Sequence, residues 1–124
     1  MIFSNQGLKV FVHREPVDMR KGHDGLASIV ENHIKEDLLD GSVFLFINKS
    51  RRLCKALYFD GTGLVIIHKR LEIGSFMNFL AFKEYQRISI SELALIFEGA
   101  SIRLQKSPKK FSYGSNKRRS KNKS

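Results

Sequence analysis

The chain has 124 residues, of which 42% are hydrophobic and 27% charged, enough apolar material to bury the core of one domain without disulfides or a metal. Its single cysteine, Cys54, excludes an intrachain disulfide and any zinc site built from cysteine pairs. The net charge is +10, and the position of this charge along the chain is more informative than its size.

The positive charge is concentrated near the C-terminus. Eight Lys and Arg residues and no acid follow Gln105, whereas the first 105 residues hold fourteen Lys and Arg against twelve Asp and Glu. We therefore expect a nearly balanced globular domain over residues 1–105, followed by a basic, disordered tail over residues 106–124.

No segment of the sequence has the features of a membrane protein. The longest apolar runs are far shorter than the roughly 20 residues of a membrane span, and residues 1–7 lack the pattern of a signal peptide. We expect a cytoplasmic protein. In that reducing compartment the apolar neighbours of Cys54 favour a buried packing role over a catalytic thiol.

The first elements in chain order are a strand, a turn and a helix. Residues 8–13 alternate as in a strand, which Pro16 ends. Leu26, Ile29, Val30 and Ile34 then form one stripe at helical spacing, predicting an amphipathic helix of about three to four turns that packs on a sheet. His33, on the border of the stripe, is expected to be partly buried.

Three strand-like runs follow, at residues 43–47, 53–59 and 64–71. The connections between them are short and rich in turn-forming residues, which predicts antiparallel neighbours in a meander. In the middle run, Leu53, Lys55 and Leu57 share one face while Cys54 and Ala56 take the other. Both faces are largely apolar, so we expect a central strand covered on both sides, in which Lys55 needs water or a polar partner.

The rest of the domain is less periodic. Phe76 to Phe82 is predicted to be an irregular segment that covers the core, and residues 87–90 to be a short strand. Ser89 and Glu92 have the spacing of a capping box, with Ser91 as a competing N-cap, before a short apolar helix that Gly99 ends. Together these elements predict an α+β fold: an antiparallel meander sheet of four or five strands, one main amphipathic helix on it and a short C-terminal helix.

The turn between Pro16 and the helix combines glycines with cations. Gly22 and Gly25 flank the expected helix start, where free N–H groups would meet Arg20 and Lys21, an arrangement that could seat a phosphate. The alternative is that the glycines only form the turn, while the cations are solvated or paired locally with acids such as Asp18.

Other cations fall at the same end of the predicted meander. The first hairpin loop and the end of the third strand lie together because the chain direction reverses twice, so one basic rim is predicted; solvated loop ends paired with Asp60 or Glu72 are the alternative. The candidate nucleic-acid-binding residues of the domain are Arg20, Lys21, Lys49, Arg51, Arg52, Lys55, Lys69 and Arg70.

The tail offers a second candidate. Phe111 and Tyr113 lie between its eight cations, which include Lys117, Arg118 and Arg119. This resembles a nucleic-acid-binding arm whose aromatic rings stack on bases; a merely solubilising tail is the alternative. Signals for an enzyme are weak. The acids Asp18, Asp24, Asp60 and Glu72 could cluster to hold Mg²⁺ as in a nuclease, but no carboxylate pair has an informative spacing, and the four histidines form no ligand pattern. We expect no catalytic residues, no metal and no cofactor.

Several of these motifs together resemble a known family. They are Pro16-Val17-Asp18-Met19-Arg20-Lys21-Gly22, Asp24-Gly25-Leu26, Arg51-Arg52-Leu53 with Lys55 and Leu57, Asp60-Gly61 with Gly63-Leu64, and Lys69-Arg70-Leu71-Glu72 with Gly74 and Phe76. In this order and with these gaps, over residues 7–99, the chain resembles the TnpB-like accessory protein of the insertion sequence 66 family of bacterial transposable elements. It differs from the usual pattern in lacking Trp, with Asn78 after Phe76-Met77 and His23 at a position usually aromatic.

The resemblance implies a non-enzymatic protein that assists transposition, while a separate, larger transposase performs the strand transfer. We expect it to bind DNA, either element ends or non-specific duplex, through the basic rim and the tail. The alternative is a protein–protein module that docks on the transposase through Phe76 to Phe82 without touching DNA. The oligomeric state does not follow from the sequence.

Overall fold

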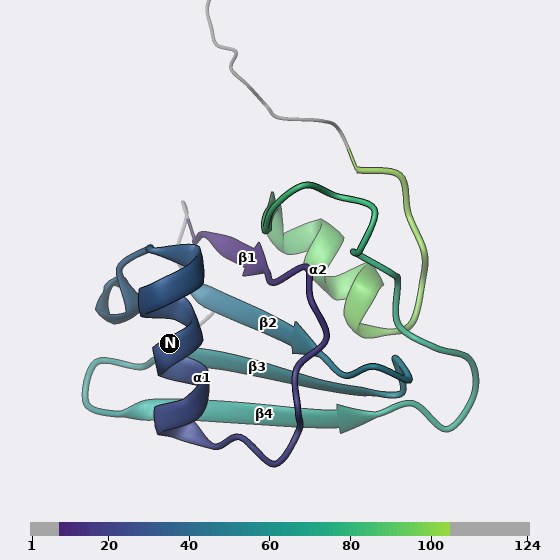
Figure 1. The fold of residues 1–124 in the computed structure, drawn as a ribbon. Coiled ribbons are helices and arrows are strands. Elements are labelled where there is room, and N and C mark those ends of the chain that lie inside the picture. Colours follow the sequence, from purple (N-terminus) through teal and green to yellow (C-terminus); the bar gives the residue numbers. More distant parts are fainter. Residues whose placement is uncertain (1–7, 105–124) are drawn as a thin grey trace, which may run out of the picture.

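The computed structural model describes residues 8–104. Five strands form one sheet in the order β4-β3-β2-β1-β5, with helices on both faces (Figure 1). The strands are β1 (Val10–Val12), β2 (Val43–Ile47), β3 (Leu53–Phe59), β4 (Leu64–Arg70) and β5 (Gln86–Ile88). The predicted α+β fold is confirmed, and the expected tail over residues 106–124 lies outside the described residues.

The meander of β2, β3 and β4 is antiparallel, as its short loops require. The structure adds a feature that the sequence did not indicate: β1 pairs with β2 in parallel, with Phe11 opposite Phe44. The connection between these two strands is long enough to contain the main helix, which is the usual way for a chain to join parallel neighbours. β5 completes the sheet by pairing antiparallel with the other side of β1.

The main helix covers one face of the sheet. It consists of α1 (His23–Ile29) and continues as a π-helical turn, η1 (Val30–Ile34), which Lys35 closes by donating its N–H to the Val30 carbonyl at 2.6 Å. Leu26, Val30 and Ile34 are buried, as their helical spacing predicts. They pack against four side chains of the sheet, Phe11, Phe44, Phe46 and Leu57. A short 3-10 turn, η2 (Leu38–Asp40), leads from the helix to β2.

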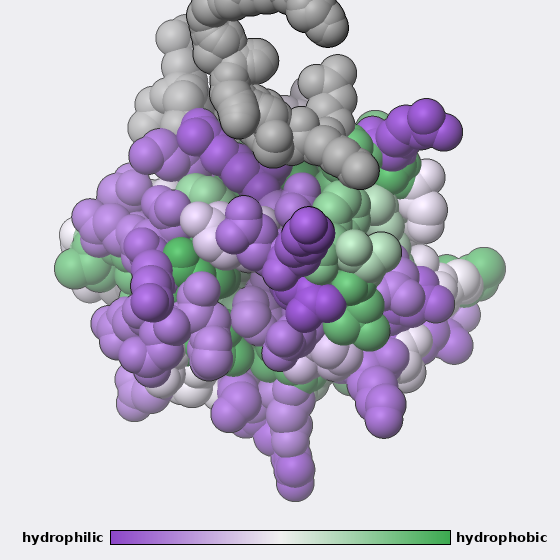
Figure 2. Space-filling model, turned by 45° about the horizontal axis from the view of Figure 1, so that its top comes forward, coloured by the Kyte–Doolittle hydropathy of each residue, from purple (hydrophilic) through white to green (hydrophobic). Residues whose placement is uncertain are grey.

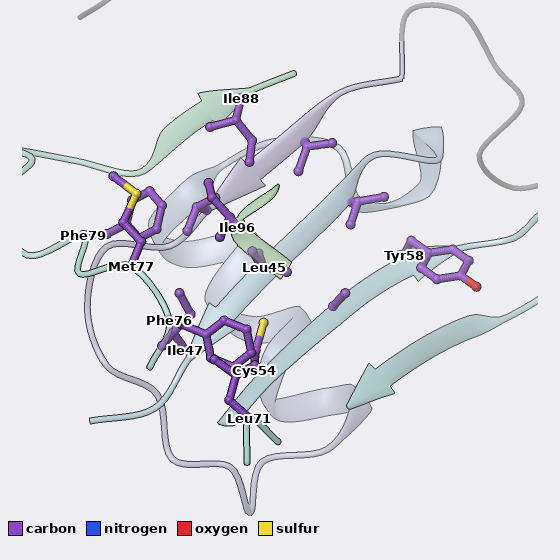
Figure 3. Packing of buried hydrophobic residues seen from close by; sticks show 14 residues of the cluster. Leu45, Ile47, Cys54, Tyr58, Leu71, Phe76, Met77, Phe79, Ile88 and Ile96 are labelled. Atoms are coloured by element: carbon purple, nitrogen blue, oxygen red, sulfur yellow. The ribbon is translucent and has the colours of Figure 1, made fainter. Parts of the chain in front are cut away.

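The opposite face carries α2 (Ile90–Phe97) and the irregular chain between β4 and β5. The Ser89 side chain accepts the Glu92 N–H at 3.0 Å and the Glu92 carboxylate accepts the Ser89 N–H at 2.8 Å, so the capping box forms with Ser89 as the N-cap. Figure 3 shows how this layer packs around Phe76, which lies beside Cys54 and Leu71. The predicted covering segment is therefore part of the core.

Cys54 is buried, and burial raises the pKa of its thiol to about 12. Its side chain is fully buried within the core cluster on the α2 side of the sheet, as the packing role predicts. His33, in contrast, is exposed, and the prediction of a partly buried side chain is wrong. His33 is part of the π-helical turn, and its ring centre is 6.1 Å from that of His13. Within residues 8–104 no helix is both long and apolar enough to cross a membrane.

Candidate nucleic-acid interface

One end of the sheet gathers chain ends that are far apart in the sequence. Because β1 and β2 are parallel and the other pairs antiparallel, β1, β2 and β4 all finish at the end where β3 and β5 begin. This is the right-hand end of the sheet in Figure 1. We call the cations there the basic end: Arg14, Arg20, Lys21, Lys49, Arg51, Arg52, Lys55 and Arg70.

The Pro16 turn is fixed to this end by two sets of bonds. The Val17 N–H donates to the Ile47 carbonyl at 3.0 Å, which attaches the turn to the end of β2. Lys55 then donates from Nζ to the Met19 and Lys21 carbonyls, each at 2.9 Å. The lysine that needed a polar partner in the middle strand thus finds two main-chain acceptors and holds the loop against β3.

The two glycines of this turn have different roles. A Cβ on Gly25 would lie 3.1 Å from the Lys21 Cβ, so glycine permits the close approach of the turn to the first helical residues. Gly22 has extended backbone and open space around its Cα, so it needs no special conformation. Both glycines shape the turn, and the phosphate seat proposed from the sequence stays a prediction.

Three arginines of the basic end fasten the irregular chain after β4. Arg51 donates from Nη1 to the Phe76 carbonyl at 2.9 Å. Arg52 donates to the carbonyls of residues 71 and 72 at 3.1 and 3.2 Å. Arg14 donates to the Leu80 and Phe82 carbonyls at 2.6 and 2.5 Å. A carbonyl partner orients a guanidinium without cancelling its charge, so these contacts leave positive charge at the surface.

Carboxylates neutralise part of the basic end. Arg20 pairs with Asp18 at 2.6 Å, and the hydrogen bonds from the Arg20 side chain and N–H lower the pKa of Asp18 to about 2. Arg70 pairs with Glu72 at 2.9 Å and Arg14 with Glu15 at 3.0 Å. The local acid partner that was the alternative for Arg20 is therefore present. The Arg20–Asp18 and Arg70–Glu72 pairs are solvent-exposed, so salt screens them strongly, whereas the Arg14 side chain is partly buried.

Lys69 lies apart from the other predicted site residues. On β4 it alternates with its neighbours, and its amine lies on the α2 side of the sheet. There Nζ donates to the Phe97 carbonyl at 2.8 Å and sits 4.9 Å from the centre of the Phe97 ring. Lys69 thus caps the end of α2. The tail residues Lys117, Arg118 and Arg119 lie outside the described residues.

Two adjoining hollows run along the basic end. One, of about 550 Å³, lies between the Pro16 turn and the first hairpin loop. The second, of about 250 Å³, continues toward Met77 and Leu80. Both are lined by Pro16, Asn48 and Lys49. The cations that reach one or both of them are Arg14, Arg20, Lys49 and Arg51.

Two residues of this site were not identified from the sequence. Arg14 was not among the predicted site residues, and no local pattern indicates that it reaches residues 80 and 82. Asn48 builds the hairpin loop, because its Oδ1 accepts the N–H groups of Arg52 and Leu53 at 3.1 and 3.0 Å. An asparagine at the start of a turn is a known signal for such a role and could have been used.

The structure also locates the groups considered for other functions. Phe76, Met77 and Phe79 are 0%, 9% and 3% exposed, so a partner docking on this segment would meet mainly Leu80, at 46%.

Among residues 8–104, no three His, Cys, Asp or Glu side chains are grouped so as to hold a metal ion. Asp60 instead accepts the N–H groups of Thr62 and Gly63 in its own turn, and these hydrogen bonds lower its pKa.

The fold and site therefore define a small α+β protein with a basic end formed by the Pro16 turn, the first hairpin loop and the end of β4. The family model of the IS66 Orf2-like proteins matches residues 8–107. The chain belongs to this family, which indicates an accessory role in the transposition of an insertion sequence.

Two relatives come from Sinorhizobium fredii (strain NBRC 101917 / NGR234), and both are named as uncharacterised proteins. The chain is 35% identical to y4jC over 77 residues, which cover 62% of this chain and 66% of that protein. It is 33% identical to y4hO over 103 residues, which cover 83% of this chain and 90% of that protein. The chain thus spans just under two thirds of y4jC. No solved structure matches the chain significantly.

Proposed function

We propose that this protein is a non-enzymatic accessory factor for DNA transposition that binds the DNA backbone through its basic end, assisted by the basic tail. The observation that supports the proposal best is how the cations are held. Arg51, Arg52 and Lys55 are oriented by main-chain carbonyls and retain their charge, and Lys21 and Lys49 are exposed beside them.

This arrangement suits a chain of phosphates better than one small anion. Four of the cations, Arg14, Arg20, Lys49 and Arg51, line two adjoining hollows rather than converging on a point, so several phosphates could be contacted in sequence. Such contacts position a protein on DNA and carry little base selectivity. Selection of element ends would then come from the partner transposase or from the shape of the DNA.

The two lysines give the sharpest test, because the arginines also fasten the fold. We expect the full chain to bind a fluorescent duplex in an anisotropy titration, with an affinity that falls steeply as salt rises. Lys21→Glu combined with Lys49→Glu should weaken binding about tenfold or more and lower the salt slope by roughly two, one for each lost phosphate contact. Arg87→Glu combined with Arg103→Glu, both exposed and neither of them among the cations of the basic end, is the control with the same charge change.

Two outcomes would count against this assignment. Absence of duplex binding at low salt would remove DNA as a direct partner and favour docking on the transposase. Binding that survives the lysine changes but is lost when Lys117, Arg118 and Arg119 are all changed to Gln in the full chain would assign DNA contact to the tail alone.

A further inference from the structure

The two edges of the sheet differ in how they are protected. β5 has three residues, and Arg87 in its centre is exposed, so this edge offers little for another strand to pair with. β4 has seven residues, and its first four side chains, Leu64 to Ile67, are apolar and only partly buried. Figure 1 shows β4 at the border of the sheet, with β3 on one side and no strand on the other. A long, apolar edge strand of this kind is a site for strand addition.

Two hydrogen bonds establish which backbone groups of β4 face outward. At one end of the β3–β4 pair the Leu71 N–H donates to the Arg52 carbonyl at 2.8 Å, and at the other the Asp60 N–H donates to the Gly63 carbonyl at 3.0 Å. Residues of an antiparallel pair alternate between facing the partner strand and facing away. The odd-numbered residues from 63 to 71 therefore face β3, and the N–H and C=O groups of the even-numbered residues from 64 to 70 face the open edge.

From this arrangement we propose that the open edge of β4 pairs antiparallel with β4 of a second copy, about a two-fold axis at Ile66, joining two sheets into one. In this register Leu64 opposes His68 of the second copy and Val65 opposes its Ile67. All outward-facing groups from 64 to 68 then find partners, and the apolar residues meet one another on both faces of the joined sheet.

The charges of β4 favour a second copy of this strand as the partner and favour antiparallel over parallel pairing. Lys69 of one copy falls opposite Gly63 of the other, and Arg70 opposite Thr62, beside the turn that contains Asp60. Parallel pairing would instead place the Lys69-Arg70 pairs of the two copies side by side, which is unfavourable. Because the cations occupy only the second half of β4, pairing with its reversed copy keeps the two cationic halves apart while the apolar residues 65–67 meet. The proposal concerns the edge of the sheet and does not depend on DNA binding.

The apolar surface beside β4 extends this contact. A hollow of about 350 Å³, lined by Ala56, Ile67, Leu93 and Phe97 among others, lies between α2 and the sheet. Figure 2 shows green, hydrophobic side chains over the part of the surface where α2 lies. In the joined sheet, Val65 of the second copy is placed next to Ile67, so pairing would add apolar contacts to this side as well as backbone hydrogen bonds.

The first test measures the mass of the full chain by sedimentation equilibrium over a wide concentration series. We expect a monomer–dimer equilibrium that His68→Pro shifts toward the monomer, with a dissociation constant raised about tenfold or more, because proline removes an outward N–H. The His68 side chain is exposed and its N–H is not used by β3, so the variant should fold, which circular dichroism checks. His68→Thr, which keeps the N–H, should dimerise like the natural chain.

The second test uses cysteine cross-linking to determine how the two β4 strands are aligned. Residues at the two-fold axis have Cα atoms about 5.5 Å apart, within the reach of a disulfide, so Ile66→Cys should cross-link two copies under mild oxidation. Cysteines introduced by His68→Cys would lie about 13 Å apart and should not. Buried Cys54 is present in both variants. A monomer at all concentrations, a dimer that His68→Pro leaves unchanged, or equal cross-linking of both cysteine variants would each overturn the proposal.

Discussion

The two faces of the sheet are covered in different ways. On one face a continuous helix, residues 23–34, places a regular stripe against Phe11, Phe44 and Phe46. On the other, an irregular chain and the short α2 cover the strands and leave a hollow of about 350 Å³. The helix satisfies its own backbone groups, whereas an irregular segment needs outside partners.

The irregular chain between β4 and β5 finds its hydrogen-bond donors among the arginines of the basic end. Carbonyl groups between residues 71 and 82 accept hydrogen bonds from Arg14, Arg51 and Arg52, all of which lie at the ends of other strands. The same side chains that make this end positive thus also hold the α2 side of the fold in place. Loss of DNA binding after mutation of these arginines would therefore not by itself identify them as DNA contacts, which is why the lysines carry that test.

The largest expected loss of stability comes from a substitution on the face of the sheet that the continuous helix covers. Phe44 is fully buried and stacks on Phe11 with ring centres 5.5 Å apart, so Phe44→Ala should lower the free energy of unfolding by about 3–5 kcal/mol, measured in urea. Met77→Ala on the other face should cost about 2 kcal/mol, because a chain without regular structure can close around the missing atoms. Equal losses would show that the two layers are packed with the same rigidity.

An intermediate effect on stability distinguishes an arginine that holds the irregular chain in place from a lysine that only adds surface charge. Arg51→Met keeps the length of the side chain but leaves the partly buried Phe76 carbonyl without its donor, so we expect a loss of about 1–3 kcal/mol. Lys49→Met, two residues earlier and exposed, should change stability by less than about 0.5 kcal/mol. If both variants unfold alike, the arginine is only a surface cation and the irregular cover is held by its apolar side chains.

The smallest expected effect is a pH dependence of stability, and it comes from His13, on the face that the continuous helix covers. Burial lowers the pKa of His13 below its ordinary 6.5, with opposing influence from Glu15 and further lowering from His33 and Arg14. Below about pH 6.5 the unfolded chain therefore takes up this proton more readily than the folded protein does. Stability contributed by the neutral imidazole is present above that pH and is lost as the pH falls toward the lowered value.

Urea unfolding at a series of pH values between 7.5 and 5 measures this loss. His13→Gln, which cannot titrate, should give a flatter dependence of the unfolding free energy on pH than the natural chain. His23→Gln, which removes an exposed imidazole from the start of α1, is the matched control. A slope that is the same for the natural chain and His13→Gln would mean that the imidazole is as well hydrated in the folded protein as in the unfolded one.

The sequence by itself determined the parts of the fold that repeat or are local. The stripe of Leu26, Val30 and Ile34, the alternation along β3 and the capping box at Ser89 all depend on residues close in the chain, so periodicity and spacing were sufficient to predict them. The motif order was also sufficient to identify the family, which the match over residues 8–107 confirmed.

Only the tertiary structure decided how the strands are ordered and where the cations point. The parallel pairing of β1 with β2, the reach of Arg14 to residues 80 and 82, and the placement of Lys69 on the α2 side join residues distant in the chain. A long side chain of Lys or Arg carries no periodic signal that fixes the direction of its head group. Its partners exist only once the sheet has brought their carbonyls within reach.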